Sequence, residues 1–162
     1  ELVNDALQQG FTEPDPRDDL SGMDVARKLV ILAREMGLDM NVNDIHVESL
    51  VDPNHLSLSV NEYLEAMSSG DQAMNDRYQN ALENNEKLSY VAQIDENGNA
   101  SVSLKNLSND HSFFSLKGTE NIIAIHSDYY SNYPLVLRGP GAGREVTASG
   151  LFFDLLSIIR AQ

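Results

Sequence analysis

The sequence contains no cysteine among its 162 residues. This absence excludes disulfide frameworks, thiolate nucleophiles, iron–sulfur clusters and cysteine zinc sites. The chain is also short of positive charge: 11 Lys and Arg residues stand against 25 Asp and Glu residues, which gives a formal net charge of −14. Such a surface repels both a phosphate backbone and an anionic lipid surface, so we expect neither nucleic acid nor a membrane as a partner.

Long apolar runs are missing as well. No run approaches the roughly 18–20 residues that span a bilayer, and no basic segment followed by an apolar one marks a signal peptide. The sequence starts with Glu1 rather than Met, so we expect it to be cut from a longer protein. We expect a cytoplasmic location, which the lack of cysteine suits. Hydrophobic residues make up 41% of the chain, enough for one domain with a core.

The first half of the sequence predicts helices. Residues 2–9 have helical apolar spacing, and Gly10 stops this first helix. A loop stiffened by two prolines follows. Ser21 then offers an N-cap, with Asp24 in the capping-box position, for a helix that runs to Met36. This helix is apolar on more than one side, which predicts that it is mostly buried.

The second half predicts antiparallel strands and a final strand–loop–helix. The clearest signal is a hairpin around Asn97-Gly98, a pair that suits a type I′ turn. The other expected elements are a strand over 45–51, polar helices over 60–68 and 71–85, strands over 121–130 and 134–139, and a helix over 145–162. Together the elements predict an α+β fold with a mixed or antiparallel sheet covered by helices.

The segment TEPDPRDDLSGMDVARK, residues 12–28, concentrates negative charge in front of the apolar helix. Its five carboxylates belong to Glu13, Asp15, Asp18, Asp19 and Asp24. So many carboxylates repel one another unless a cation lies among them. Arg17 and Arg27 balance some of this charge. The remainder could bind a metal ion or the ammonium group of an amino-acid ligand.

Asp24 and Lys28 are four residues apart on the predicted helix, so they share a face. The simplest interpretation is an ordinary ion pair on a solvated surface. The apolar helix around the pair favours a second interpretation, in which the pair lies in a cleft and Lys28 serves as a general acid. The residues alone leave both open.

Two further features carry weaker signals. The loop GPGAG, residues 139–143, places glycines between a strand and a helix, where backbone can approach a ligand. Its spacing is not that of a dinucleotide fingerprint, and a plain tight turn is the simpler interpretation. The four histidines show no metal-ligand spacing, so we expect no metal site.

Two long segments resemble one enzyme family. GFTEPDPRDDLSGMDVARKLVILARE, residues 10–35, resembles the signature of homoserine dehydrogenase, and PLVLRGPGAGREVTASGLFFDLL, residues 134–156, resembles the C-terminal segment of that family. The resemblance implies the reduction of L-aspartate 4-semialdehyde to L-homoserine, a step towards threonine, methionine and isoleucine. The sequence ends soon after its last helix, with no regulatory domain. In this it is most similar to the bifunctional aspartokinase–homoserine dehydrogenases, so we expect a fusion to aspartokinase.

The resemblance also implies a domain organisation. Residues 1–133 match the catalytic and dimerisation domain of the family. Residues 134–162 match the C-terminal strand, Gly-rich loop and helix that return to a Rossmann domain, which this chain lacks. We therefore expect the isolated chain to be inactive and to form a homodimer or a higher homo-oligomer. The tyrosine-rich stretch SDYYSNY, residues 127–133, suits such an interface.

The family's catalytic and substrate roles carry over to four residues. Lys28 resembles the lysine that donates a proton to the carbonyl oxygen, and Glu13 and Asp24 resemble the carboxylates that hold homoserine. Asp19 resembles a further aspartate of the substrate pocket.

For the cofactor, the resemblance implies NADP or NAD, bound mainly by the absent Rossmann domain. Gly10 and Gly143 match positions where backbone approaches the cofactor, and Gly141 belongs to the same Gly-rich loop as Gly143. The alternative is a non-catalytic module that binds an amino acid or mediates dimerisation.

Overall fold

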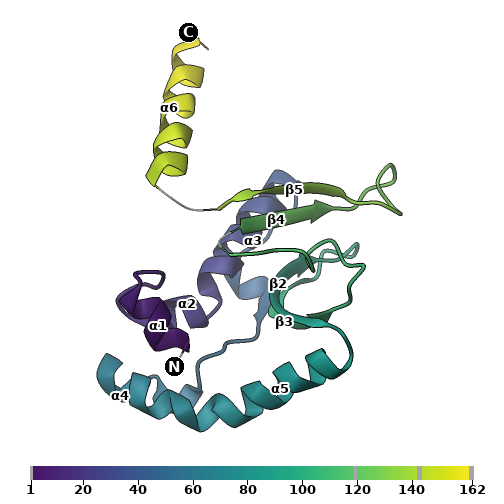
Figure 1. Ribbon diagram of the computed structural model, residues 1–162. Coiled ribbons are helices and arrows are strands. Elements are labelled where there is room, and N and C mark those ends of the chain that lie inside the picture. Colours follow the sequence, from purple (N-terminus) through teal and green to yellow (C-terminus); the bar gives the residue numbers. More distant parts are fainter. Residues whose placement is uncertain (1, 119, 142–143, 161–162) are drawn as a thin grey trace. The chain divides into compact units, whose positions relative to one another are not determined.

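The computed structural model describes residues 2–118, 120–141 and 144–160. Helices and two small sheets give an α+β architecture, as the sequence predicts (Figure 1). The contacts divide the chain into two compact units, Glu1–Leu107 and Ser108–Gln162. The division at residue 133 that the family resemblance implies is a separate matter, and it stays a prediction.

A mixed three-stranded sheet forms the centre of the first unit, in the order β1-β3-β2. Strand β1 (Ile45–Val47) runs parallel to β3 (Ala100–Leu107), and β2 (Lys87–Ile94) pairs antiparallel to β3. The strand predicted over 45–51 is therefore too long. Its last backbone–backbone hydrogen bond to the sheet joins the Glu48 amide to the Val102 carbonyl oxygen at 2.8 Å. The next residues leave the sheet and line the hollow described below.

Helix α3 (Met23–Glu35) packs one stripe of small and branched side chains against this sheet. The stripe consists of Ala26, Leu29, Val30 and Ala33, each at most 5% exposed. The expectation that the helix is mostly buried is wrong, because Ile31 on its other side is 61% exposed. A single stripe suffices to bury the helix on the sheet, and the opposite face carries charge.

The start of α3 differs from the predicted capping box. Ser21 ends a short preceding helix, α2 (Pro16–Leu20), and Gly22 takes the N-cap position with φ +76°. This left-handed residue, which glycine adopts readily, lets one helix follow directly on the other. The hydroxyl oxygen of Ser21 accepts a hydrogen bond from the Met23 amide at 3.2 Å. Asp24 does not cap the helix and instead forms an ion pair along it.

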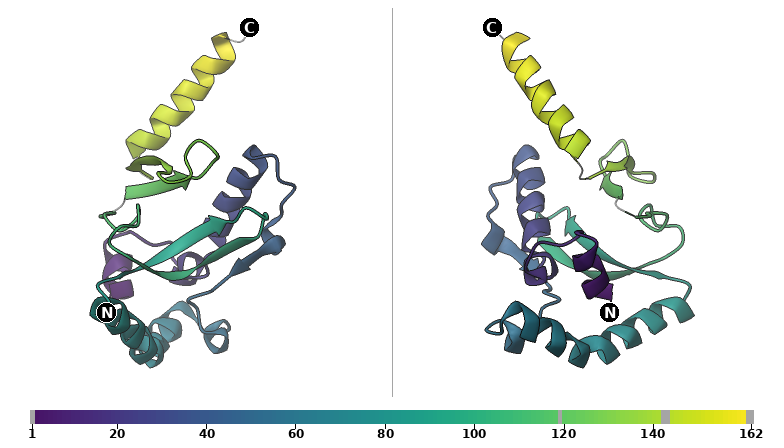
Figure 2. Two further views of the ribbon diagram at one scale, coloured as in Figure 1. Left: turned by 90° about the vertical axis from the view of Figure 1, so that its right-hand side faces the viewer. Right: turned by 60° about the vertical axis from the view of Figure 1, so that its left-hand side comes forward.

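The predicted polar helices are present. Helix α4 (Val60–Ala66), a 3-10 segment (Met67–Gly70) and α5 (Asp71–Glu83) follow one another as one bent helical run (Figure 1). Ala81 of α5 is buried and α5 contacts β2. Figure 2 shows α3 and α5 on opposite sides of the sheet. None of the helices within the described residues is long and apolar enough to cross a membrane.

The remaining elements of this unit are short. Helix α1 (Leu2–Gln8) ends before Gly10, which has φ +71°, as predicted. Two 3-10 turns cover Val42–Asp44 and Pro53–His55.

The hairpin of β2 and β3 is confirmed, but its turn is not type I′. That turn requires positive φ at both central residues, and of the predicted pair only Gly98 has it, at +82°. The side chain of Asp95 accepts hydrogen bonds from the amides of Asn97 and Asn99 at 2.9 and 2.8 Å. The loop is therefore wider than predicted because Asp95 organises it from its first residue.

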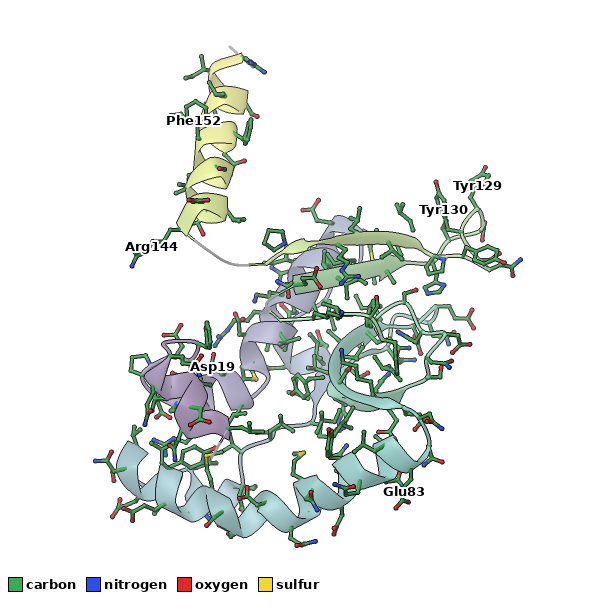
Figure 3. All side chains as sticks on the ribbon, in the orientation of Figure 1. Asp19, Glu83, Tyr129, Tyr130, Arg144 and Phe152 are labelled. Carbon is green, nitrogen blue, oxygen red and sulfur yellow. The ribbon has the colours of Figure 1, made fainter. Side chains whose placement is uncertain are left out.

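The second unit contains a two-stranded antiparallel sheet, β4 (Glu120–Ile125) with β5 (Leu135–Pro140), and helix α6 (Arg144–Arg160). Strand β4 ends at Ile125, so the strand predicted to residue 130 is too long. Tyr129 and Tyr130 lie in the turn beyond the strand ends (Figure 3). Several apolar side chains of α6 are more than half exposed: Leu151, Phe152, Phe153, Leu155, Ile158 and Ile159.

Gly22 is the position where backbone conformation and packing together demand glycine. A Cβ at this position would overlap the Tyr90 hydroxyl and would lie 2.9 Å from Cγ1 of Val47. Gly37, with φ +83°, has open space around it and serves as a matched control. We predict that Gly37→Ala costs about 1–2 kcal/mol from backbone strain alone. Gly22→Ala should cost a further amount of about 1–3 kcal/mol from the overlap.

Urea unfolding of the two variants measures this difference. Equal losses of unfolding free energy in Gly22→Ala and Gly37→Ala would contradict the packing described at the start of α3.

Candidate functional site

An open hollow of about 860 Å³ lies in the first unit, between the carboxylate-rich segment, the first turns of α3 and the residues after β1. Its lining consists of Glu13, Asp15, Arg17, Asp18, Asp19, Ser21, Met23, Asp24, Arg27, Ser49, Val51 and Leu56. All five carboxylates predicted to gather are present, against two guanidinium groups. The hollow is therefore acidic and suits a cationic group of a ligand.

The structure brings the three predicted substrate carboxylates, Glu13, Asp19 and Asp24, to this one hollow. Lys28 does not line it, but its Nζ atom lies 2.8 Å from Oδ2 of Asp24. The side chains of Lys28 and Asp24 are 67% and 60% exposed. The interpretation that places the ion pair within a cleft is thus half right: Asp24 faces the hollow, and the pair as a whole is open to solvent.

Short helix α2 carries Asp19 and follows Glu13 closely in the chain. Asp15 caps this helix, since its side chain accepts a hydrogen bond from the Arg17 amide at 3.0 Å, and Pro16 occupies the first turn. Asp19, labelled in Figure 3, accepts a hydrogen bond from the Glu13 amide at 2.8 Å through Oδ2. The loop predicted for this segment is therefore wrong over residues 16–20, which form a helix. An Asp N-cap followed by Pro is a helix-start signal that could have revealed the helix.

Arg17 connects the carboxylate-rich segment to a distant turn. Its Nε and Nη2 atoms donate to the Asp15 carboxylate at 2.6–3.1 Å, and the Nη1 atom donates to three backbone carbonyl oxygens. These carbonyls belong to His55, Leu56 and Leu58, at 3.2, 3.1 and 2.8 Å. The hydrogen bonds from the guanidinium hold the pKa of Asp15 below its ordinary value.

The charge pattern of the sequence predicts only charge balance for Arg17. Its partners lie about 40 residues away along the chain. A local sequence pattern does not predict hydrogen bonds between residues so far apart in the chain.

The predicted cofactor glycines fall in different parts of the chain. Gly10 has positive φ, and its surroundings are open, so its backbone is accessible. Gly141 follows β5 in the second unit, where a Cβ would overlap the side chain of Asn121. This contact within the protein by itself explains a glycine at 141. Gly143 lies outside the described residues.

The carboxylates of the hollow suit an organic cation such as an ammonium group. Among the described residues, no group of three or more His, Asp or Glu side chains is arranged to hold a metal. Asp15 is paired with Arg17, and one oxygen of Asp19 accepts from the Glu13 amide. Glu13, Asp18 and Asp24, the last of them shared with Lys28, remain as carboxylates that can accept hydrogen bonds from an ammonium group.

Comparison with known proteins gives consistent matches over nearly the whole chain. The family model described as homoserine dehydrogenase matches residues 1–156. The chain is 47% identical over 155 residues to bifunctional aspartokinase/homoserine dehydrogenase 2 of Escherichia coli, and the match covers 96% of this chain and 19% of that protein. It is 44% identical over 160 residues to the chloroplastic bifunctional aspartokinase/homoserine dehydrogenase 2 of Arabidopsis thaliana, covering 98% and 18%. The chain thus spans less than a fifth of the length of these relatives.

Solved structures share the fold. A crystal structure of a Candida auris protein of unknown function superimposes with a TM-score of 0.92 at 42% identity, over 98% of this chain and 45% of that one. A putative homoserine dehydrogenase from Archaeoglobus fulgidus superimposes with a TM-score of 0.72 at 26% identity, over 96% and 41%.

The Asp15–Arg17 pair predicts a specific dependence of stability on pH. Because the pKa of Asp15 is lower in the folded chain than in the unfolded chain, where it is about 3.9, the pair stabilises the fold above that pH. The contribution is lost as the pH falls through the folded pKa. Asp15→Asn should therefore lower the melting temperature at pH 7, and the difference from wild type should shrink towards pH 3.

The measurement is a series of thermal melts from pH 7 to pH 3. Asp39→Asn, at an exposed position, is the control and should track wild type throughout. A difference between Asp15→Asn and wild type that stays constant down to pH 3 would refute this role for Asp15.

Proposed function

The chain belongs to the homoserine dehydrogenase family, and from this premise we propose that it is the catalytic portion of an enzyme that reduces L-aspartate 4-semialdehyde to L-homoserine. The observation that carries the proposal is the acidic hollow, which Glu13 and Asp24 both line, with Lys28 in an ion pair with Asp24. Both substrate and product carry an α-ammonium group, which these carboxylates suit.

In the proposed reaction, the aldehyde carbon gains a hydride and the carbonyl oxygen gains a proton. The reduced nicotinamide of NADPH or NADH, when bound, supplies the hydride. Lys28 donates the proton to the developing alkoxide through its ammonium group, and solvent returns that proton to the exposed amine. Asp24 holds the lysine side chain by the 2.8 Å ion pair, and Glu13 and Asp24 orient the substrate through its ammonium group.

The binding of the dinucleotide needs more than this chain. Of the glycines expected near the cofactor, Gly10 offers an accessible backbone. A separate Rossmann domain, as in the family, would supply the main cofactor site. The short span of this chain relative to its relatives supports that view. Inactivity of the isolated chain follows from it.

Fusion to an aspartokinase is proposed from the same relatives, which are bifunctional by name. Homodimerisation and a cytoplasmic location stay predictions. The plant relatives are chloroplastic by name, so location varies among the proteins that this chain resembles.

Replacing Lys28 distinguishes the proposed enzyme from the alternative, a non-catalytic binding module. Lys28→Ala in the full-length protein should lower kcat by about 10²- to 10⁴-fold, the usual contribution of a positioned general acid. Stability should change by only about 0.5 kcal/mol, since an exposed ion pair four residues apart on a helix contributes little. Lys105→Ala, on the surface of β3, is the control.

The assay follows oxidation of L-homoserine with NADP+ and with NAD+. Near-normal kcat in Lys28→Ala would remove the lysine from the mechanism. A wild-type full-length protein that turns over neither cofactor would favour the alternative of a non-catalytic module.

Glu13 should act on substrate affinity. Glu13→Gln keeps the shape of the side chain and removes the charge, so a charge-assisted hydrogen bond worth about 1.5–3 kcal/mol is lost. The KM for L-homoserine should rise by about tenfold to a hundredfold, while the KM for the cofactor stays the same. Glu35→Gln, at the far end of α3 and outside the hollow, should leave both values unchanged. An unaltered KM for L-homoserine in Glu13→Gln would rule out this assignment.

A further inference from the structure

The side chain of Arg17 makes more hydrogen bonds, and is more buried, than charge balance alone requires. Its side chain is 16% exposed. Its guanidinium joins one carboxylate, that of Asp15, to three carbonyl oxygens of residues 55–58. The Cζ atom also lies 5.2 Å from the centre of the Tyr63 ring, and Tyr63 is 1% exposed. The planar guanidinium is hydrogen-bonded along two edges and lies over an aromatic ring, so it has one well-defined position.

This arrangement fixes helix α2 at its start. A helix of five residues is far too short to be stable alone, so its position depends on what holds its ends. Arg17 holds the first turn against residues 55–58. At the other end, the Leu20 carbonyl oxygen accepts a hydrogen bond from the Leu50 amide at 2.9 Å.

Helix α2 in turn fixes the backbone at Glu13. The Glu13 amide donates to Oδ2 of Asp19, two residues after Arg17 on the same helix. Asp24 and Lys28 depend on a different support, because they belong to α3, which the core fixes directly. A disturbance at Arg17 therefore reaches Glu13 while the lysine keeps its place.

We propose that Arg17 is a positioning residue for substrate binding: it fixes α2 on the 55–58 turn, and through α2 and Asp19 it fixes the backbone at Glu13, whose carboxylate receives the substrate ammonium group. The inference rests on the function proposed above. It adds a residue and a route that neither the charge pattern nor the signature assigns.

The test is a double-mutant cycle in the full-length protein with Arg17→Met and Glu13→Gln. Arg17→Met should raise the KM for L-homoserine by about tenfold, the scale expected when a binding group is displaced, with kcat within about threefold of wild type. Combined with Glu13→Gln, it should add less than about twofold, because both changes remove one interaction. Arg17→Lys keeps the charge but not the planar guanidinium, so its KM for L-homoserine should lie between those of Arg17→Met and wild type.

Arg34→Met is the matched control for a purely structural arginine. Arg34 also donates to a backbone carbonyl oxygen, that of Met40 at 3.1 Å, but it does not line the hollow. This variant should lose stability and keep its KM. Multiplying effects of Arg17→Met and Glu13→Gln on KM, or a wild-type KM in Arg17→Met, would overturn the inference. So would a raised KM in Arg17→Met beside an unchanged KM in Glu13→Gln, since Arg17 would then act through another group.

Hydrogen exchange supplies a readout that needs no activity. In Arg17→Met the amides of residues 11–20 should exchange faster, while those of residues 24–35 keep wild-type rates; Arg34→Met should leave residues 11–20 unchanged. Equal exchange over residues 11–20 in Arg17→Met and wild type overturns the inference whatever the kinetics show. A wild-type protein that does not oxidise L-homoserine refutes the proposed function instead, and this exchange comparison still decides whether Arg17 fixes the segment.

Discussion

The burial of one stripe of α3 on the mixed sheet is the constraint on which the rest of the site depends. With Ala26, Val30 and their neighbours turned towards β1, β3 and β2, the helical period turns Asp24 and Lys28 away from the core. The pair is thus exposed as a consequence of packing, at a position that the core fixes. The start of α3 also depends on Gly22, because only a residue without a Cβ can make the left-handed turn beneath the Tyr90 hydroxyl.

The two sides of the hollow are held in place by different interactions. The lysine side of the site belongs to a long helix packed on the core, whereas the Glu13 side belongs to a segment with little core of its own. That segment is held by polar contacts instead: Asp15 caps α2, Arg17 reaches the 55–58 turn, and Asp19 binds the Glu13 amide. The core therefore fixes the backbone that carries Lys28, whereas the position of Glu13 depends on charged hydrogen bonds.

Much of the fold was predictable because its signals are local. Gly10 follows the end of α1 where expected, α3 ends next to the predicted Met36, and the pattern around Asn97-Gly98 predicts the hairpin correctly. The charge pattern also indicates that the carboxylates gather, which the hollow confirms. Other features depend on contacts distant in sequence. The burial of only one side of α3, the short extent of β1 and the partners of Arg17 are set by tertiary packing, and the type I′ turn fails because Asp95 competes for the turn amides.

The proposed function requires that Glu13 and Asp24 receive a substrate ammonium group beside the Lys28 amine. A crystal structure of the full-length protein with NADP+ and L-homoserine tests it most directly. We expect the homoserine ammonium within about 3 Å of a Glu13 or Asp24 carboxylate oxygen, and the side-chain hydroxyl at a similar distance from Nζ of Lys28. Homoserine bound with its carboxylate towards Glu13, or bound away from Lys28, would contradict these roles of Glu13, Asp24 and Lys28.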